Sequence, residues 1–192
     1  MIVDSFPVLR YNEENFQQGV FMEFITYKKL DHEEYLKAVY DLVVLGDKEF
    51  IPPLSSRSST TQQALAEAKG NGIDSYFAEM KEQSFVLAFE DGKVAGFMSF
   101  KENYENPHLP KGENLYASTC VVHPDFRGRG MMRAFYEAMI AAFPTRPIYT
   151  RTWHENIGHL KVLDRLGFTL LETIENDRGP GVHTVYFGRQ PK

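Results

Sequence analysis

The spacing of hydrophobic and polar positions changes along the chain, and each spacing predicts its own kind of element. Short apolar runs bounded by turn residues predict strands at Phe21–Leu30, Ser84–Glu90, Lys93–Lys101, Leu115–Val122, Pro147–Trp153, Phe168–Glu175 and Val182–Gly188. Apolar positions three and four residues apart predict helices at Asp31–Leu45, Thr60–Lys69 with a continuation at Ile73–Lys81, Gly130–Phe143 and Asn156–Leu166. The first 22 residues are weakly patterned and predict at most one strand, around Ile2–Leu9.

Local capping and turn residues support several of these elements. Asp31 with Glu34 three residues later has the pattern of a capping box, in which each residue bonds a backbone N–H at the start of the first helix. Thr60 with Gln63 has the same spacing and predicts the start of the second helix. Asp91–Gly92 lies between two apolar runs and is a strong signal for a tight hairpin.

The order of the predicted elements is β-α-α-β-β-β-α-β-α-β-β, which indicates an α/β protein with one mixed sheet. Strand–helix–strand connections in the second half predict one parallel pair, and the hairpins predict antiparallel pairs elsewhere. We expect a single domain over residues 23–192, preceded by an N-terminal extension over residues 1–22.

Composition narrows the classes of protein that the sequence allows. The chain has 192 residues, 43% of them hydrophobic, and a formal net charge of −5, which argues against a general nucleic-acid or membrane-surface binder. A single cysteine excludes an intramolecular disulfide and a cysteine-rich zinc site, and we expect no metal. No apolar run approaches the roughly 18 residues of a membrane span, and the N-terminal stretch lacks the segments of a signal peptide. These features predict a cytoplasmic protein.

The most unusual stretch is Asp125–Arg133, DFRGRGMMR, which gathers arginines and glycines just before a predicted helix. The first N–H groups of a helix have no partner within the helix, and with the helix dipole they attract anions. Gly128 and Gly130 leave the backbone open to a phosphate. A polyanion is therefore one natural partner, and a solvated loop whose glycines only turn the chain is the alternative.

Two common nucleotide motifs do not fit this stretch. A phosphate-binding loop of the Walker type needs Lys and Ser or Thr after its last glycine, and Gly130 is followed by two methionines. A Rossmann fingerprint needs a third glycine where the chain has Arg133.

Val121–Met139 resembles the acetyl-CoA-binding motif of the GCN5-related N-acetyltransferases, the GNAT family, whose pattern is [Q/R]-x-x-G-x-[G/A]. Arg127 and Gly130 match it, whereas Met132 stands where Gly or Ala is usual. A second stretch, Asn156–Phe168, resembles the family block N-x-x-A-x-x-L-Y-x-K-x-G-F. Together with the order of elements, the resemblance covers about 165 residues.

The resemblance implies the GNAT fold, a mostly antiparallel sheet with one splayed parallel strand pair and about four flanking helices. It implies acetyl-CoA as the co-substrate, with its pantetheine arm between Leu115–Val122 and Ile148–Trp153. The residues implied in its binding are Cys120, Val121, Val122, Arg127, Gly128, Arg129, Gly130, Met131, Met132, Arg133, Asn156 and His159.

The implied reaction is direct attack of a primary amine, on a small molecule or a peptide, on the acetyl thioester in a ternary complex. The family often uses a tyrosine as the general acid at the position seven residues after Asn156, but this chain has Leu163 there. As candidate bases we consider Glu102, which follows a strand near the expected acceptor cleft, and His154, whose ordinary pKa suits proton transfer. Each has an alternative role, as a solvated loop carboxylate and as a capping or packing residue.

Three questions stay open at this level. Cys120 fits a buried core thiol, since no nearby base is identifiable for a covalent route. Leu163 keeps open a second function, a GNAT-fold module that binds acyl-CoA or regulates without transferring the acyl group. The N-terminal extension pairs either with its own sheet or with a second subunit in a homodimer.

Overall fold

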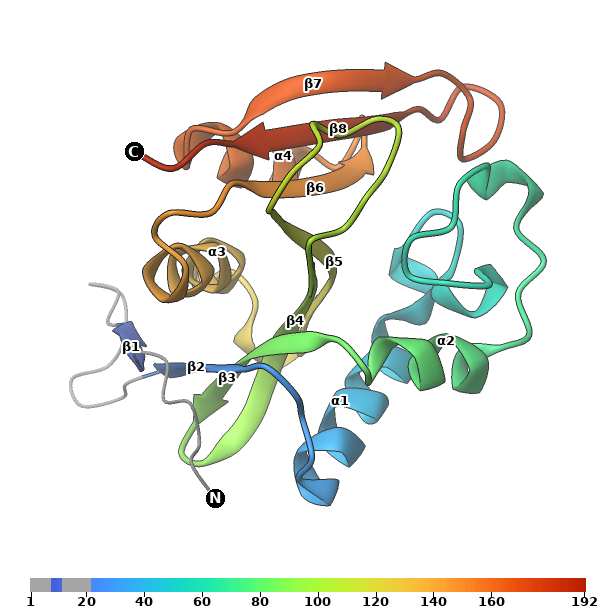
Figure 1. Cartoon of the computed structure of the whole chain (residues 1–192). Coiled ribbons are helices and arrows are strands. Elements are labelled where there is room, and N and C mark those ends of the chain that lie inside the picture. Colours follow the sequence, from blue (N-terminus) through green and yellow to red (C-terminus); the bar gives the residue numbers. More distant parts are fainter. Residues whose placement is uncertain (1–7, 12–21) are drawn as a thin grey trace.

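A computed structural model describes residues 8–11 and 22–192 of the chain. Its centre is an eight-stranded sheet with the strand order β1-β2-β3-β4-β5-β6-β8-β7 (Figure 1). The strands are β1 (Leu9–Tyr11), β2 (Met22–Tyr27), β3 (Ser84–Glu90), β4 (Lys93–Glu102), β5 (Leu115–Val122), β6 (Ile148–Trp153), β7 (Thr169–Ile174) and β8 (Thr184–Arg189). All neighbouring strands are antiparallel except β5 and β6, which confirms the predicted mixed sheet with one parallel pair.

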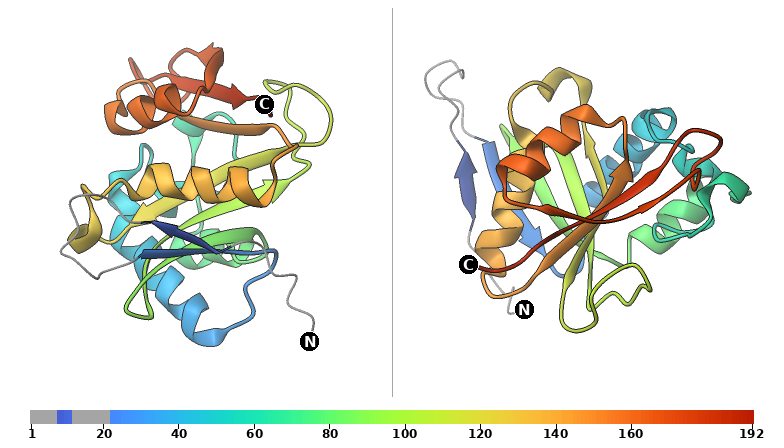
Figure 2. Two further views of the ribbon diagram at one scale, coloured as in Figure 1. Left: turned by 90° about the vertical axis from the view of Figure 1, so that its left-hand side faces the viewer. Right: turned by 90° about the horizontal axis from the view of Figure 1, so that it is seen from above.

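Four α-helices cover the two faces of this sheet. They are α1 (Glu33–Gly46), α2 (Ile73–Met80), α3 (Met131–Ala142) and α4 (Ile157–Arg165). Figure 2 shows α1 and α2 on one face, and α3 and α4 on the other. Each face has its own apolar core: Phe135 of α3 and Leu163 of α4 are buried in one, and Val43 of α1 and Tyr76 of α2 are buried in the other. The helices therefore cover both faces of the sheet, and a site can form where the strands end between the two helix layers.

Most predicted elements are confirmed within one to three residues. The hairpin at Asp91–Gly92 joins β3 and β4, and both of its residues have positive φ angles, 49° and 75°, as a tight turn of this kind requires. Asn156 caps α4 by accepting a hydrogen bond from the backbone N–H of His159, and Gly167 follows the helix with φ 77°.

Two predictions in the first half are wrong. The first helix begins at Glu33, and its N-cap is His32 without a side-chain hydrogen bond, so Asp31 and Glu34 form no capping box. The segment from Thr60 to Lys69 is not a helix and holds only a 3-10 turn at Leu65–Glu67.

Tertiary contacts explain the second error. The backbone N–H and hydroxyl of Thr60 bind the Glu79 carboxylate at 2.6 and 3.1 Å, and Gln83 donates to the Thr60 hydroxyl at 2.7 Å. Ala64 has a left-handed φ of 49°, which a helix excludes. Hydrogen bonds to the Glu79 acceptor of α2 and from the Gln83 donor after it thus replace the helical bonds that the local spacing predicted.

The N-terminal extension contributes one described strand. β1 pairs antiparallel with β2 of the same chain, and Leu9 packs against the α3 core. The strand predicted around Ile2–Leu9 lies mostly outside the described residues. No helix among the described residues has both the length and the apolar character needed to cross a membrane.

The parallel pair is short, and its two strands separate soon after they begin. Pairing joins only Leu115–Ala117 to Ile148–Thr150, although β5 continues to Val122 and β6 to Trp153. A register shift between β4 and β5 leaves Ser118 as an extra residue directly after the last paired position, and such bulges bend a strand. The Thr150 hydroxyl donates to the Ala117 carbonyl at 3.0 Å at this point. Beyond it, a gap opens in the sheet.

Candidate functional site

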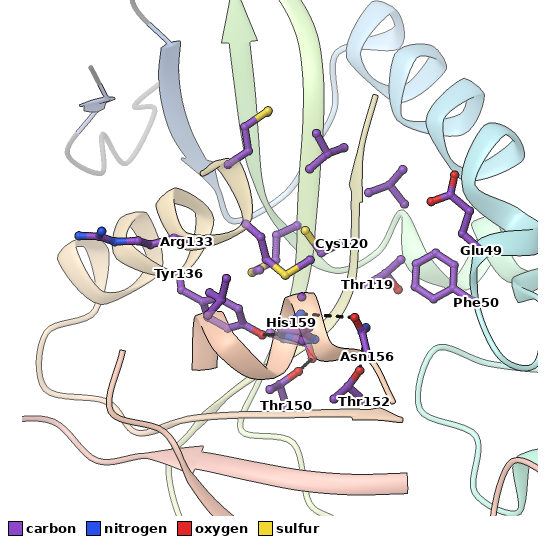
Figure 3. A pocket seen from close by; sticks show the side chains of 18 of the residues that line it. Glu49, Phe50, Thr119, Cys120, Arg133, Tyr136, Thr150, Thr152, Asn156 and His159 are labelled. Atoms are coloured by element: carbon purple, nitrogen blue, oxygen red, sulfur yellow. Dashed lines mark hydrogen bonds between the residues drawn. The ribbon is translucent and has the colours of Figure 1, made fainter. Parts of the chain in front are cut away.

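The gap between β5 and β6 opens into a cleft of about 610 Å³. Its walls come from the second half of β5, the turn before α3, the first turns of α3 and α4, and β6. The segment after α1 and two loops close it from the other face of the sheet. Figure 3 shows Tyr136 and His159 on one side of this cleft and Glu49 and Phe50 on the other. The predicted strand pair and the predicted turn therefore border one cavity.

The free edge of β5 presents backbone groups to the cleft. The backbone N–H of His123 donates to the Ala95 carbonyl at 3.0 Å, which fixes the alternation of bonded and non-bonded pairs between β4 and β5. Thr119 and Val121 then bond to β4, whereas the backbone groups of Cys120 and Val122 point to the side from which β6 has separated. An extended ligand with amide groups can pair with this edge as a strand would.

The start of α3 forms the end of the cleft. Its N-cap is Gly130, and no side-chain hydrogen bond caps this end within the described part of the chain. Gly128 and Gly130 have left-handed φ angles of 75° and 69°, which side-chain-bearing residues rarely adopt. A Cβ added at Gly128 would meet nothing within 4 Å, so the space in front of this backbone is open. The arrangement suits an anion at a helix N-terminus.

The arginines of this turn differ in where they point. Arg127 lines the cleft, donating to the Val122 carbonyl at 3.0 Å and forming an ion pair of 2.8 Å with Glu49. Arg129 does not line it and instead pairs with Glu90 at 2.9 Å. Arg133 borders the cleft but forms an ion pair with Glu137 of the same helix. Arg127 is thus the turn arginine that is best placed to meet a ligand.

A buried polar pair forms the α3–α4 wall of the cleft. The Tyr136 hydroxyl and His159 Nε2 are 2.9 Å apart, and Asn156 orients His159 through its backbone. Burial lowers the pKa of His159 to about 4 and raises the pKa of Tyr136 well above its usual value. Both side chains are therefore neutral at pH 7.

Neither Cys120 nor Leu163 supplies the reactive group that its position suggests. Cys120 lines the cleft next to the β5 edge, and burial raises the pKa of its thiol to about 12, so it is protonated at neutral pH. Leu163 is fully buried in the α3–α4 core and does not line the cleft. Neither residue supplies a nucleophile or a proton donor at pH 7.

The structure does not bring the two sequence-predicted bases to the cleft. The Glu102 carboxylate binds the Arg146 guanidinium at 2.5 Å. This pair lies beside the first residues of β5 and β6, whereas the cleft lies beside the later residues of both strands. The His154 ring packs on His183 at 4.5 Å between centroids, and its Nδ1 accepts the backbone N–H of His183 at 3.2 Å. We assign neither residue a role in proton transfer. Arg129, Glu102 and His154 are thus the predicted site residues that lie outside the cleft lining.

The wall on the α1–α2 face contains arginines that no sequence motif assigned to the site. Side chains of β6 alternate between faces, so Thr150 and Thr152 face α3 and α4, whereas Arg151 and Trp153 face the other way. Arg57 and Arg178 reach the same wall from irregular loops. The alternation of β6 is a usable signal for Arg151, but no sequence pattern marks the two loop arginines.

Comparison with known proteins agrees with this geometry. A model described as "Acetyltransferase (GNAT) family" matches residues 52–168 of the chain. A search of curated proteins found no match.

Solved structures share the fold at low sequence identity. A GNAT-family acetyltransferase from Streptococcus agalactiae matches with a TM-score of 0.61 at 15% identity, over 92% of this chain and 98% of its own. The protein yncA from Salmonella typhimurium, solved with its cofactor acetyl-CoA, matches with a TM-score of 0.59 at 14% identity, over 91% of this chain and 95% of its own. The ribosomal-protein-S18-alanine N-acetyltransferase of Escherichia coli matches with a TM-score of 0.57 at 15% identity, over 87% of this chain and 93% of its own.

Proposed function

This chain belongs to the GNAT family of acetyltransferases, and from that premise we propose that it transfers an acetyl group from acetyl-CoA to a primary amine. The observation that carries the proposal is the splay of β5 from β6 directly beside the open N-terminus of α3. The free edge of β5 and the N-terminus of α3 thus border the same cleft. The strand edge suits a chain with amide groups and the helix N-terminus suits an anion, and one molecule can carry both.

The residues present fit acetyl-CoA in both parts. The backbone N–H groups from Gly128 to Arg133 and the Arg127 side chain suit a pyrophosphate, which is anionic and needs several donors. The backbone groups of Cys120 and the backbone N–H of Val122 suit the amide groups of the pantetheine arm, whereas the Val122 carbonyl already accepts a hydrogen bond from Arg127. Met132 is half-buried and packs against the core, so its bulk is directed partly away from the turn.

The reaction needs a neutral amine and a thiolate that can leave. The amine nitrogen bonds to the acetyl carbonyl carbon, the carbon–sulfur bond breaks, and the nitrogen releases a proton. Among the described residues, Glu49 and His159 are the only carboxylate and imidazole that line the cleft. Glu49 is already paired with Arg127 and His159 resists protonation, so we infer that the acceptor loses its proton to solvent before attack.

The leaving thiolate needs little stabilisation by a side-chain acid in this mechanism. A thiol has an ordinary pKa near 8.5, so a thiolate is a fair leaving group at neutral pH. The position of the family's usual acid holds Leu163, which lies within the core. We infer that the thiolate departs without a side-chain acid and takes its proton from water.

Calorimetric titration with acetyl-CoA, CoA, ATP and NAD tests the cofactor. We expect acetyl-CoA and CoA to bind and ATP and NAD to bind at least about tenfold more weakly, because only CoA also pairs with the β5 edge. Absence of acetyl-CoA binding would contradict the proposal. Thiol release in the presence of an amine panel then distinguishes transfer from binding alone.

A second function is favoured by one observation, the lack of an acid at Leu163. It is a module that binds acyl-CoA, or regulates through it, without transfer. Binding of acetyl-CoA with no thiol release for any amine supports it. A cytoplasmic location and a homodimer also stay predictions.

A further inference from the structure

Three arginines form a cationic wall on the α1–α2 face of the cleft. Arg57 follows the 3-10 turn Leu54–Ser56, Arg151 lies in β6, and Arg178 lies in the loop between β7 and β8. All three line the cleft, and Arg57 and Arg178 are only 4% and 7% exposed. None of them belongs to the turn before α3 that we assign to the pyrophosphate.

Neutral groups hold these guanidinium groups in place. Arg57 donates to the Pro52 carbonyl at 2.8 and 3.1 Å, and Arg151 donates to the Tyr186 hydroxyl at 3.3 Å. Arg178 donates to the Thr184 hydroxyl at 2.9 Å. Arg57 Nη2 and Arg178 Nη1 also share one acceptor, the Ile51 carbonyl oxygen, so the two guanidinium groups converge.

Nitrogen atoms are left over for a ligand. Within residues 8–11 and 22–192, Arg57 Nη1 and Arg178 Nη2 donate to no acceptor, and neither is sealed off from solvent. A guanidinium group presents its N–H donors as a planar fork that matches two oxygens of a carboxylate or phosphoryl group. The wall therefore keeps donors of the right kind that solvent can reach.

No carboxylate in the described part of the chain pairs directly with this wall. None of the three arginines forms an ion pair with a carboxylate of the described residues. Burial lowers the pKa of both Arg178 and Arg57, and the carboxylates that partly offset this lowering are Asp177 for Arg178 and Asp47 for Arg57. Neither carboxylate forms an ion pair with a guanidinium group: that of Asp177 accepts from the Thr184 hydroxyl, to which Arg178 also donates, and that of Asp47 accepts from Ser55.

The charges of the wall repel one another. Burial, with repulsion from Arg57 and Arg151, lowers the pKa of Arg178 to about 9, so the group still carries its charge at pH 7. Burial also raises the pKa of the neighbouring phenols of Tyr76 and Tyr116, which keeps them neutral. Holding buried like charges without a carboxylate in direct contact is unfavourable, and an anion supplied from outside would relieve it.

We propose that the acceptor amine carries an anionic oxygen group, a carboxylate or a phosphoryl group, which binds between Arg57, Arg151 and Arg178. This inference rests on the proposed function, because it assigns the wall opposite α3 to the acceptor. The wall and the acetyl-CoA residues face each other across the gap between β5 and β6. The anionic group fixes one end of the acceptor and leaves its amine directed toward the gap.

Trp153 offers a readout at the site itself. It is the only tryptophan of the chain, it lines the cleft, and its ring lies 5.8 Å from the Arg178 guanidinium carbon. Titration of its fluorescence with α-amino acids, their amides and the matching α-aminophosphonates compares anionic and neutral amines of similar shape. We expect at least one carboxylate or phosphonate to bind about tenfold or more tightly than its amide, and the two anionic arms identify the preferred group.

Two variants test whether the preference for the anionic compound arises at the arginine wall. Arg178→Gln should remove the preference for the anionic compound, whereas Arg165→Gln, which changes an exposed arginine at the end of α4, should retain it. Affinity for CoA, measured by calorimetry, should stay within about twofold in Arg178→Gln. A loss of CoA affinity equal to the loss for the anionic amine would overturn the proposal, since the wall would then bind CoA phosphates.

The comparison of an acid with its amide uses the unaltered protein and does not depend on how the variants fold. If no anionic compound binds more tightly than its amide, with or without CoA present, the proposal is wrong. Failure of the proposed function gives a different result, namely no binding of acetyl-CoA by calorimetry while the anion preference at Trp153 is still measurable.

Discussion

The Tyr136 hydroxyl and His159 Nε2 meet at 2.9 Å and join α3 to α4 across the wall of the cleft. Their rings are nearly parallel, with an interplanar angle of 24° and centroids 5.8 Å apart. Because Asn156 holds the backbone of His159, one chain of contacts runs from the α4 cap to the middle of α3. The two helices that border the proposed cofactor site are thus linked by a pair that is neutral at pH 7.

This pair predicts a pH dependence of stability. Burial lowers the pKa of His159 from 6.5 to about 4, so the unfolded chain binds a proton in a range where the folded protein does not. The free energy of unfolding should therefore fall as pH decreases from about 6.5 to 4, with a contribution from His159 of roughly 3 kcal/mol. Urea unfolding of the protein and of His159→Gln, at pH 7.5 and pH 5, measures the part of this contribution that is lost above pH 5.

The variant provides the internal control, because it lacks the titrating imidazole and keeps a polar group. We expect the stability advantage of His159 over Gln at pH 7.5 to shrink by pH 5. An advantage that is equal at the two pH values would show that His159 is not held neutral by burial.

The rate of transfer should follow the protonation of the acceptor. The proposed mechanism has no side-chain base, so log kcat/KM should rise with a slope of about one as pH increases, up to the pKa of the acceptor amine. Steady-state kinetics between pH 6 and 9, with two acceptors of different amine pKa, measure the profile. The inflection should move with the amine. An inflection at one fixed pH for both acceptors would instead reveal an enzyme base.

Gly128 and Gly92 provide a matched pair for testing the cofactor turn. Both have φ 75°, and a Cβ at either position meets nothing within 4 Å, so a leucine should cost similar stability at the two sites, about 1–2 kcal/mol. Gly92 lies in the β3–β4 hairpin, away from the cleft. We expect Gly128→Leu to weaken acetyl-CoA binding at least about tenfold and Gly92→Leu to leave it unchanged, as measured by calorimetry.

Equal affinity in both leucine variants would remove the turn from the cofactor site. Equal weakening in both would assign the effect to lost stability. Thermal unfolding of the two variants checks that the strain is similar.

The second half of the fold was predictable because local and tertiary preferences agree there. The apolar run of β5, the glycines before α3 and the Asn156 cap all form what their spacing indicates. At Thr60 the local and tertiary preferences conflict, and contacts with Glu79 and Gln83 outweigh the helical pattern. A short signal near a strong side-chain acceptor is thus a poor guide when the acceptor lies elsewhere in the sequence.

The site was predictable on one wall only. The wall of the turn before α3 is continuous in sequence, so a motif can describe it. The opposite wall combines Arg57, Arg151 and Arg178, which come together only when β6 and β8 pair and the loop after α1 folds over them. Glu102 and His154 show the reverse case, since nearness to a strand end in sequence did not place them in the cleft.

Glu49 should oppose binding of the anionic cofactor. Its carboxylate forms an exposed ion pair with Arg127 and lies at the lining of the proposed phosphate site. Such pairs contribute at most about 1 kcal/mol, so Glu49→Gln should tighten acetyl-CoA binding by up to about fivefold at low salt. Calorimetry at two salt concentrations should show the gain shrinking as salt increases. Glu23→Gln, which removes an exposed carboxylate paired with Arg10, serves as the control and should change nothing.

Cys120 should be chemically inert although it lines the cleft. Burial raises the pKa of its thiol to about 12, so the reactive thiolate is scarce even at pH 8. We expect its reaction with an aromatic disulfide reagent to be at least about tenfold slower than that of a free thiol, and slower still when acetyl-CoA covers the β5 edge. Cys120→Ala should retain kcat within about threefold, because direct attack by the amine needs no acetyl-cysteine. Loss of all turnover in a folded Cys120→Ala variant, together with acetylation of the thiol by acetyl-CoA alone, would replace direct attack with a two-step route through Cys120.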